Sequence, residues 1–318
     1  MTIPGCRPRL RVASSVAMML LICAADGRGN PLFEAADPHA VVIDGRFWIF
    51  PTEARSREPL FAAYDSEDLR HWKRHGPVLR LSDVPWITDD GQQRHHAWAP
   101  CVAVADATMY FYYSVGPQQV TPSRIGVATG PAPAGPFRDS GRPLVTGDDS
   151  FEAIDPMVFT AADGTSYLYA GGSAGRRLRA WQLGADMVSL ATELPIETPP
   201  RFTEAAFLHK QAGLFYLSYS HGAWNDAGYS VHYATGPSPT GPWNYRGEIL
   251  ASDATHKGPG HHSFIETPAG DWLIVYHRWE TTAPRGPYRG RRRIAIDRVT
   301  YRADGTIEPI RMTDGHGP

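Results

Sequence analysis

The chain has 318 residues and a formal net charge of −2 at pH 7, and it contains 31 Gly and 28 Pro. A balanced charge excludes the basic footprint that nucleic-acid-binding proteins present. Frequent Gly and Pro, without long amphipathic heptads, favour many short strands joined by turns over a helical fold. We therefore expect one large all-β domain, since such domains routinely exceed the usual domain length.

The N-terminal segment has the pattern of an export signal. Several arginines precede an apolar stretch from Val12 to Ala25, which is too short to cross a membrane as a helix. Small residues at Cys23 and Ala25 suit cleavage after Ala25, whereas the bulky Ile22 disfavours a lipoprotein site at Cys23. Residues 1–25 are thus predicted to be a signal peptide. Residues 26–318 would form one domain in the periplasm or outside the cell, with no membrane attachment.

Five copies of one hairpin-like unit follow along the chain. Three of them begin with an acidic residue, Asp37, Asp155 or Glu204, followed by an apolar run, a Gly-containing turn and an aromatic-rich run. This order is typical of a β-hairpin. The other two units keep the hairpin pattern but begin at Trp98 and His261. The units recur roughly every 50 to 60 residues, a period that indicates a propeller or a solenoid.

The second half of the unit repeats as well. Residues 126–137 and 232–243 both carry the run Ala-Thr-Gly-Pro, followed by Gly-Pro and an aromatic residue. A Pro/Gly turn between two short strands forms a second hairpin, so each unit supplies about four strands, which make one propeller blade. The five units predict an all-β, five-bladed β-propeller in a single domain. The alternative is a β-sandwich in which the likeness between the hairpins is accidental.

The placement of the three acids indicates a hydrolytic site. The innermost strands of a propeller line its central channel, so Asp37, Asp155 and Glu204 would face one another at one mouth of it. Three carboxylates at close range cannot all ionise freely, and the pKa of at least one rises through repulsion. One protonated acid and one ionised base are what hydrolysis of a glycosidic bond requires. The alternative is that Asp37-Pro38 and Asp155-Pro156 are ordinary turns before strands.

The chain resembles glycoside hydrolase family 43 over nearly all of its mature length, from Asn30 to about Pro309. The resemblance rests on motifs that occur together and in this order: Ala36-Asp37-Pro38-His39, Trp98-Ala99-Pro100, Ile154-Asp155-Pro156, Glu204-Ala205-Ala206-Phe207, Gly258-Pro259-Gly260-His261-His262-Ser263, Val275-Tyr276-His277-Arg278 and Arg292-Arg293-Ile294-Ala295-Ile296-Asp297-Arg298. It implies a five-bladed propeller that hydrolyses arabinofuranosides, xylosides and related linkages with inversion at the anomeric carbon.

The resemblance also implies a role for each acid. Asp37 matches the family's general base, and Glu204 matches its general acid. Asp155 matches the third acid, which orients the general acid and raises its pKa, as an anion beside Glu204 would do. We therefore expect these three residues to carry the catalysis.

Further residues match positions that contact the substrate or an ion. Arg292 resembles the arginine that contacts the sugar in the first subsite, and Trp98 and His262 are expected to contact the substrate as well. His261 resembles a histidine that, in many members, touches a calcium or another ion in the central channel. Because Ca²⁺ prefers oxygen ligands, a lone histidine is a poor calcium motif. For Trp98 the alternative is core packing, and for His261 and His262 it is a hydrogen-bonded pair in the core.

The resemblance predicts a substrate class without specifying the sugar. We expect an exo-acting α-L-arabinofuranosidase or β-D-xylosidase that acts on plant cell-wall polysaccharides or oligosaccharides, as residues 276–278 and 296–298 indicate. β-D-Galactofuranosidase and endo-arabinanase are alternatives within the family, since Ala205-Ala206 and the segment 84–96 depart from many relatives near the pocket. A non-catalytic carbohydrate-binding propeller and a scaffold for protein partners lie outside it, and the retained acids disfavour both. No pattern indicates an oligomeric state.

Overall fold

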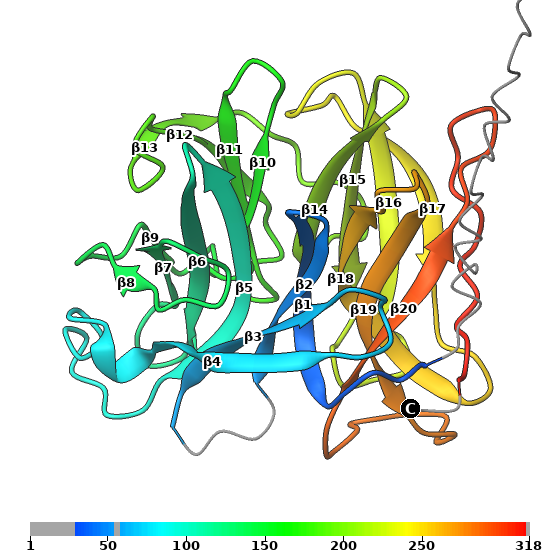
Figure 1. Cartoon of the computed structure of the whole chain (residues 1–318), viewed down its shortest axis with the longest axis horizontal. Helices are drawn as coiled ribbons and strands as arrows, with labels where there is room; N and C mark the ends of the chain where they lie inside the picture. The colour runs from blue at the N-terminus through cyan, green and yellow to red at the C-terminus, as the bar shows by residue number, and fades with distance from the viewer. Residues whose placement is uncertain (1–28, 54–57, 316–318) are drawn as a thin grey trace, which may run out of the picture.

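The computed structural model describes residues 29–53 and 58–315. The predicted signal peptide at residues 1–25 therefore lies outside the described part of the chain. Five antiparallel sheets are arranged around a central axis as the blades of a β-propeller, which confirms the predicted fold class (Figure 1). The described residues contain one short 3₁₀-helix, at Leu81–Asp83, and no helix in them is long and apolar enough to cross a membrane.

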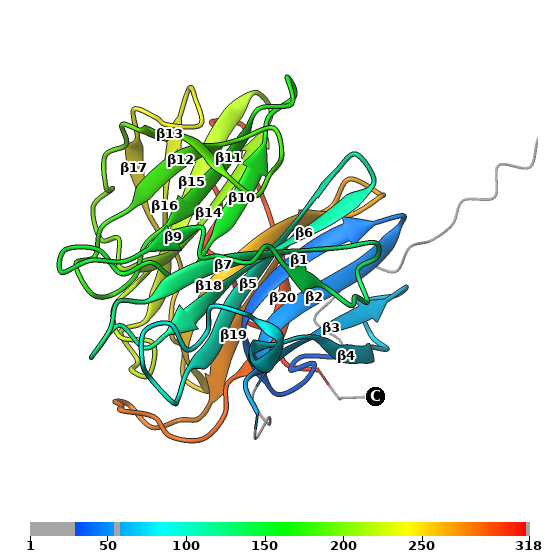
Figure 2. The same ribbon diagram turned by 90° about the vertical axis from the view of Figure 1, so that its left-hand side faces the viewer.

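Consecutive strands pair with one another within each blade, except that β9 pairs with β7. The first three blades consist of β1 (Ala35–Ile43), β2 (Arg46–Glu53), β3 (Leu60–Ser66) and β4 (Lys73–Arg80); β5 (His96–Ala105), β6 (Thr108–Gly116), β7 (Arg124–Gly130), β8 (Arg138–Asp139) and β9 (Val145–Thr146); and β10 (Met157–Thr160), β11 (Ser166–Ala170), β12 (Arg179–Leu183) and β13 (Leu190–Leu194). The last two consist of β14 (Glu204–Gln211), β15 (Leu214–His221), β16 (Ser230–Gly236) and β17 (Asn244–Leu250); and β18 (His256–Glu266), β19 (Trp272–Glu280) and β20 (Arg293–Val299). Figure 2 shows blades 3 and 4 together at the upper left, with blades 1 and 5 at the lower right.

The ring of blades closes between its first and last members. Blade 5 has three strands of its own, and the segment just before β1 runs along β20. The Leu32 N–H donates to the Ile294 carbonyl at 2.8 Å, and the Ile294 N–H donates to the Phe33 carbonyl at 3.0 Å. The N-terminal segment thereby pairs backbone groups that an open sheet edge would leave without partners. It also ties the two ends of the propeller together.

The core lies between neighbouring blades. Aromatic side chains of the second strands, such as Phe111, Tyr169 and Tyr276, are fully buried. Successive side chains of a strand point to opposite faces of its sheet, so an aromatic-rich strand packs against the blades on both sides. A fully buried Phe side chain contributes about 1.5–3 kcal/mol. This packing holds the starts of the inner strands in place, and the three acids lie there.

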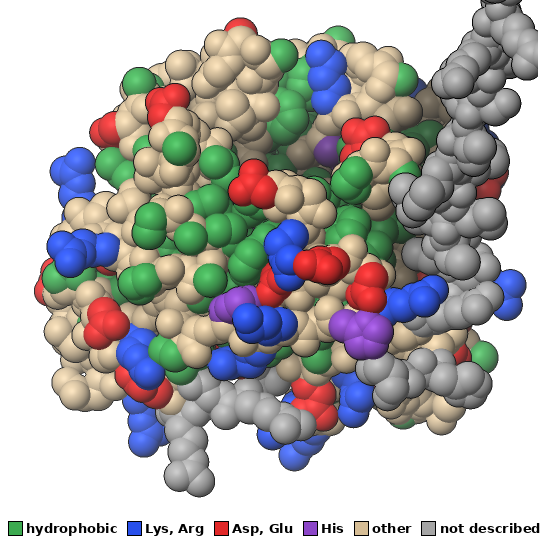
Figure 3. All heavy atoms as spheres, in the orientation of Figure 1, with side chains coloured by type: hydrophobic (Ala, Val, Ile, Leu, Met, Phe, Trp, Pro, Cys, Tyr) green, Lys and Arg blue, Asp and Glu red, His purple; other side chains and the backbone are tan. Residues whose placement is uncertain are grey.

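Charged side chains of both signs are scattered over the face of the molecule shown in Figure 3. Basic and acidic side chains are interspersed over the face shown in Figure 3, and no continuous basic patch extends across the described residues drawn there.

Candidate active site

Each blade has a residue in the left-handed backbone conformation, which lies within the inner strand or up to two residues before it. These residues are Asp37, Ala99, Asp155, Ala205 and His261, with φ values between 40° and 58°. In blades 1, 2, 4 and 5 the pairing with the second strand shifts register at the same place, as it does at a β-bulge. Comparing the five units by sequence aligned Trp98 and Glu204 with these positions. The structure places both one residue earlier.

Four of these left-handed residues are anchored in the same way. The backbone N–H of each donates to a side chain on the second strand of the preceding blade. The pairs are Asp37 with His277 Nδ1 at 3.1 Å, Ala99 with Thr52 Oγ1 at 2.8 Å, Asp155 with Ser114 Oγ at 2.9 Å and His261 with Ser220 Oγ at 2.8 Å. The repeated bond fixes the start of each inner strand relative to its neighbour.

The inner strand of blade 4 is anchored differently, because the matching position in blade 3 is Gly171. Gly171 has no side chain that could accept a hydrogen bond, and a Cβ there would lie 2.1 Å from the Arg177 carbonyl oxygen. The Ala205 N–H instead donates to Oδ2 of Asp155 at 3.1 Å. The third acid thus takes the place of the missing side chain, and the bond holds its carboxylate beside the residue that follows Glu204.

The acids of blades 1, 3 and 4 line one pocket with a volume of 250 Å³. The residues that line it are Asp37, Trp98, Glu152, Ile154, Asp155, Ser173, Glu204, Trp224, His261 and Arg292. The three predicted acids, Asp37, Asp155 and Glu204, are each more than nine-tenths buried. Because the surroundings exclude most of the water, charges in this pocket act on one another more strongly than surface charges do.

Asp37 is held as an ionised carboxylate. Burial raises its pKa, whereas the Arg292 guanidinium, which donates to Oδ1 at 2.7 Å, lowers it. The neighbouring His261 and His277 lower the pKa further, so that it lies well below the usual range of an aspartate. A buried carboxylate that stays ionised at neutral pH can act as a general base.

The pKa values of Glu204 and Asp155, in contrast, are raised. Burial raises the pKa of Glu204 to about 7, a hydrogen bond from Tyr229 opposes this, and the charges of Asp37 and Glu152 add to it. The pKa of Asp155 lies well above its ordinary value, mainly through burial and then through repulsion by Glu204 and Asp37. The two carboxyl groups titrate as a pair. The pocket therefore holds one ionised acid and a pair that retains a proton near neutral pH.

Tyr229 restrains the pKa of Glu204, and its replacement gives a first test of this electrostatic arrangement. Its hydroxyl donates to Glu204 Oε1 at 2.8 Å, which stabilises the charged form. Tyr229→Phe should raise the pKa of Glu204, so the basic limb of the kcat/KM profile should move up by about 1 pH unit. The measurement is the pH profile of both enzymes, and a limb that moved down would contradict the assignment of Glu204 as the acid.

Three other predicted site residues also line the pocket. Arg292 binds Asp37 and lies 4.8 Å from the centre of the Trp224 ring as a cation–π pair. The ring of Trp98 stacks on His96, with centroids 5.2 Å apart. His261 Nδ1 lies 3.5 Å from Asp37 and 3.6 Å from Asp155, and burial lowers its pKa to about 4, so its imidazole is neutral at pH 7.

His262 does not line the pocket, although a substrate contact was expected for it. Its Nε2 is hydrogen-bonded to Ser218 Oγ at 2.7 Å, and its ring lies against Phe207 and Phe264. Adjacent residues of a strand point to opposite sides, so His262 turns into the core next to His261. This is the buried, hydrogen-bonded position given above as the alternative.

Sequence reasoning missed several residues around the acids, among them Glu152, Trp224 and Tyr229. Tyr229 and Trp224 come from the loop between β15 and β16, whose sequence is not part of the repeated motifs. Glu152 could have been found from the sequence, because it is an acidic residue only three positions before Asp155.

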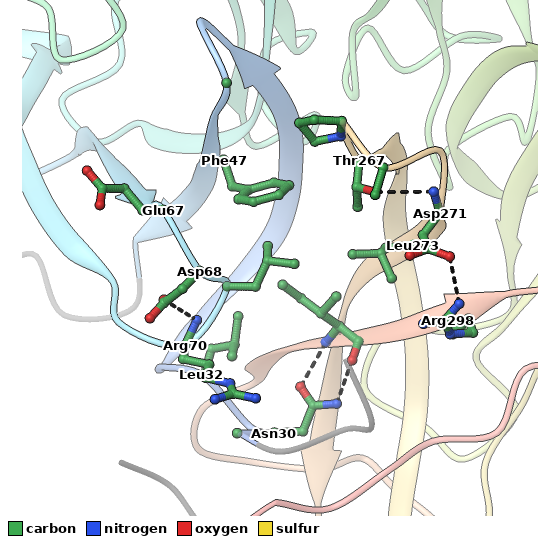
Figure 4. A pocket seen from close by; sticks show the side chains of 16 residues that line it. Asn30, Leu32, Phe47, Glu67, Asp68, Arg70, Thr267, Asp271, Leu273 and Arg298 are labelled. Carbon is green, nitrogen blue, oxygen red and sulfur yellow. Dashed lines mark hydrogen bonds and ion pairs between the residues drawn. The ribbon is translucent and has the colours of Figure 1, made fainter. Parts of the chain in front are cut away.

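A second cavity, of 420 Å³, lies between blades 1 and 5, near the C-terminal ends of their inner strands β1 and β18. Leu32, Phe47 and Leu273 form part of its apolar wall (Figure 4). Its polar groups are paired with one another, for example Asp271 with Arg298 at 2.7 Å. The acids of the catalytic pocket do not line it. Nothing among its described residues therefore suggests chemistry there.

Comparisons with known proteins agree with this geometry. The family model described as "Glycosyl hydrolases family 43" matches residues 29–307. A β-D-galactofuranosidase of Aspergillus niger, xynD, is 34% identical over 90% of this chain and 85% of that protein. Xylosidase/arabinosidase 43A of Humicola insolens is 30% identical over 86% of this chain and 95% of that protein.

A solved structure gives the same result for the fold. The β-xylosidase/α-arabinofuranosidase CoXyl43 from a compost microbial metagenome, in complex with xylotriose and in a calcium-free form, is 29% identical with a TM-score of 0.72. The alignment covers 88% of this chain and 95% of that one. The family match extends over all five blades and includes every residue that lines the pocket. The chain therefore belongs to the glycosyl hydrolases of family 43.

Proposed function

We propose that this glycosidase removes single α-L-arabinofuranosyl or β-D-xylosyl residues from plant cell-wall polysaccharides or oligosaccharides, with inversion. One observation carries the proposal. The same pocket holds Asp37, whose pKa is well below its usual range, and Glu204, whose pKa is raised to about 7. An ionised base and a protonated acid on opposite sides of a sugar are the two groups that a single displacement needs.

Each group then has a defined task. Asp37 removes a proton from a water molecule as that water attacks the anomeric carbon, and Arg292 keeps the Asp37 carboxylate oriented and ionised. Glu204 donates its proton to the glycosidic oxygen as the bond breaks. Asp155, held by the Ala205 N–H, stays beside Glu204, and the charge that the two carboxyl groups share favours a proton on Glu204. Water attacks from the side opposite to the leaving group, so the product is inverted.

The dimensions of the pocket favour a terminal sugar. Its volume of 250 Å³ falls just below the usual range of ligand pockets, and Trp98 and Trp224 form part of its wall. A long polysaccharide running through the site would need an open groove. This supports exo action over endo action.

β-D-Galactofuranosidase activity is a second candidate, because the Aspergillus niger relative that is 34% identical bears that name. Assays with 4-nitrophenyl α-L-arabinofuranoside, β-D-xyloside and β-D-galactofuranoside separate the sugars. One of the three substrates should be hydrolysed clearly faster than the other two. Failure to hydrolyse any of the three would overturn the proposal.

The stereochemistry of the product tests the mechanism itself. We expect proton NMR of the first-formed sugar to show the inverted anomer, and the Asp37 and Glu204 carboxylates to lie roughly 6.5–9.5 Å apart, which leaves room for the attacking water. A retained anomer would mean that one carboxylate forms a covalent intermediate, and the assigned roles would then be wrong.

Calcium is not part of the proposal, because the residues around His261 do not fit the ion. Ca²⁺ takes about six to eight oxygen ligands, whereas His261 offers nitrogen, and the carboxylates nearest to it bind Arg292 and the Ala205 N–H. Within the described ranges, the group of three ligand side chains close enough to share an ion is His256, Glu280 and Asp314. There the guanidinium of Arg278 already bonds to both carboxylates.

A further inference from the structure

A fourth carboxylate lines the pocket and takes no part in the mechanism above. Glu152 lies in the turn between β9 and β10 and is 6% exposed. Its Oε2 accepts hydrogen bonds from the Ala174 N–H at 2.7 Å and from Ser173 Oγ at 3.3 Å. No described residue donates a hydrogen bond to its Oε1.

The surrounding backbone makes room for this carboxylate. A Cβ at Gly172 would lie 2.6 Å from Glu152 Oε2, so a larger residue there would displace the carboxylate. Glycine at this position lets the loop approach Glu152 closely enough for Ser173 and Ala174 to bind it. Oε2 of Glu152 is thus held by the protein. Oε1 is the oxygen that this pocket-lining residue has left for a ligand.

Such an arrangement is costly unless a ligand completes it. A buried carboxylate loses its hydration, and only hydrogen bonds or a cation compensate for that loss. No arginine or lysine pairs with Glu152 among the described residues, and Arg292, which lines the same pocket, binds Asp37. A sugar hydroxyl is the donor that the proposed substrates supply, and a hydrogen bond from it to a charged oxygen is stronger than one to a neutral oxygen.

Glu152 lies on the side of the general acid. It precedes Asp155 by three residues in blade 3, and blade 3 is next to blade 4, whose inner strand begins at Glu204. Asp37, which activates the water, comes from blade 1 and is bound by Arg292. The general acid stands at the glycosidic oxygen, so the sugar beyond that oxygen lies nearest to it.

We infer that Glu152 is a substrate-binding residue whose Oε1 accepts a hydrogen bond from a hydroxyl of the leaving-group sugar. The inference rests on the proposed function and adds to it. It means that the enzyme recognises the sugar on both sides of the scissile bond, so that oligosaccharides bind better than the single sugar that is released. It also predicts that Glu152 matters little for substrates whose leaving group has no hydroxyl.

Binding measured without turnover tests this directly. In a Glu204→Ala background, calorimetry would give the Kd of α-1,5-arabinobiose and arabinose, and of β-1,4-xylobiose and xylose. We expect Glu152→Ala to weaken binding of the disaccharide of the preferred sugar about 10–100-fold and to change binding of its monosaccharide less than about twofold. Because Glu204 is absent, a change in its pKa cannot produce this difference.

Two further variants separate loss of the Glu152 charge from a change in the loop and from a nonspecific effect of substitution. Glu152→Gln retains an oxygen for the Ala174 N–H and so preserves the loop, yet it loses the charge, and we expect about a 3–10-fold weaker Kd for the disaccharide. Glu197→Ala, on the exposed segment after β13, is the control and should change nothing. Equal losses for disaccharide and monosaccharide, or no loss in Glu152→Gln, would overturn the inference. Wild-type enzyme that hydrolysed neither disaccharide would instead defeat the proposed function.

Discussion

Asp37→Ala is expected to lower kcat/KM by about 10²–10⁴-fold on every substrate, whatever its leaving group. Asp37 is the acid that Arg292 keeps ionised at neutral pH. Without it no group in the pocket is placed to accept the proton of the attacking water, and water must be activated for each substrate alike. The measurement compares a disaccharide with its 2,4-dinitrophenyl glycoside. Substantial activity of the variant on either would show that another group is the base.

Glu204→Ala should behave differently on the same two substrates. The disaccharide needs a proton on its leaving oxygen, so its kcat/KM should fall by about 10²–10⁴-fold. The dinitrophenolate leaves without a proton, so hydrolysis of the aryl glycoside should remain within about tenfold of wild type. Glu197→Ala again serves as the exposed control. If the Asp37 and Glu204 variants lost activity in parallel on both substrates, the division into base and acid would have to be abandoned.

The fold was predictable because its signals are local and repeated. Each hairpin carries its own turn residues and aromatic strand, so five copies can be counted without knowing how they pack. Asp37 and Asp155 occupy equivalent positions, each followed by proline, and they were aligned correctly. A repeat of this kind also predicts convergence, because equivalent strand starts meet at one mouth of the channel.

The register of the other units could not be read in the same way. At Glu204 and Trp98 a slip of one residue leaves the hairpin pattern intact, so the sequence fits both alignments. The left-handed residue at the bulge decides between them, and alanine holds that position in both units. Alanine is a poor marker of this conformation, since residues with φ above zero are usually Gly, Asn or Asp.

The supporting groups were harder still to predict, because they come from loops whose sequences do not repeat from blade to blade. Tyr229 reaches Glu204, and Trp224 contacts Arg292, only through the folded path of the segment between β15 and β16. The bond from Ala205 to Asp155 depends on the absence of a side chain at Gly171. A missing side chain becomes informative only when the neighbouring blades reveal what normally stands there.

That bond makes Asp155→Asn a selective test of how the third acid works. Asparagine keeps an oxygen for the Ala205 N–H, so position is preserved while the charge is lost. Asp155 and Glu204 titrate as a pair, and repulsion by Glu204 raises the pKa of Asp155. Without the Asp155 carboxyl group we expect Glu204 to lose its proton at lower pH. The basic limb of kcat/KM reports that acid in the free enzyme, so it should move to lower pH. At pH values above the limb, kcat/KM should fall about tenfold for each pH unit by which the limb moves down.

The pH profile distinguishes this charge effect from a purely positional one. Activity lost at neutral pH should be partly recovered in more acidic buffer, until Asp37 begins to take up a proton. Ser114→Ala provides the comparison, because it removes the hydroxyl that accepts the Asp155 N–H at 2.9 Å but changes no charge. It should lower the rate without moving the limb. If Asp155→Asn gave the same uniform loss as Ser114→Ala, Asp155 would position its neighbours without tuning the proton on Glu204.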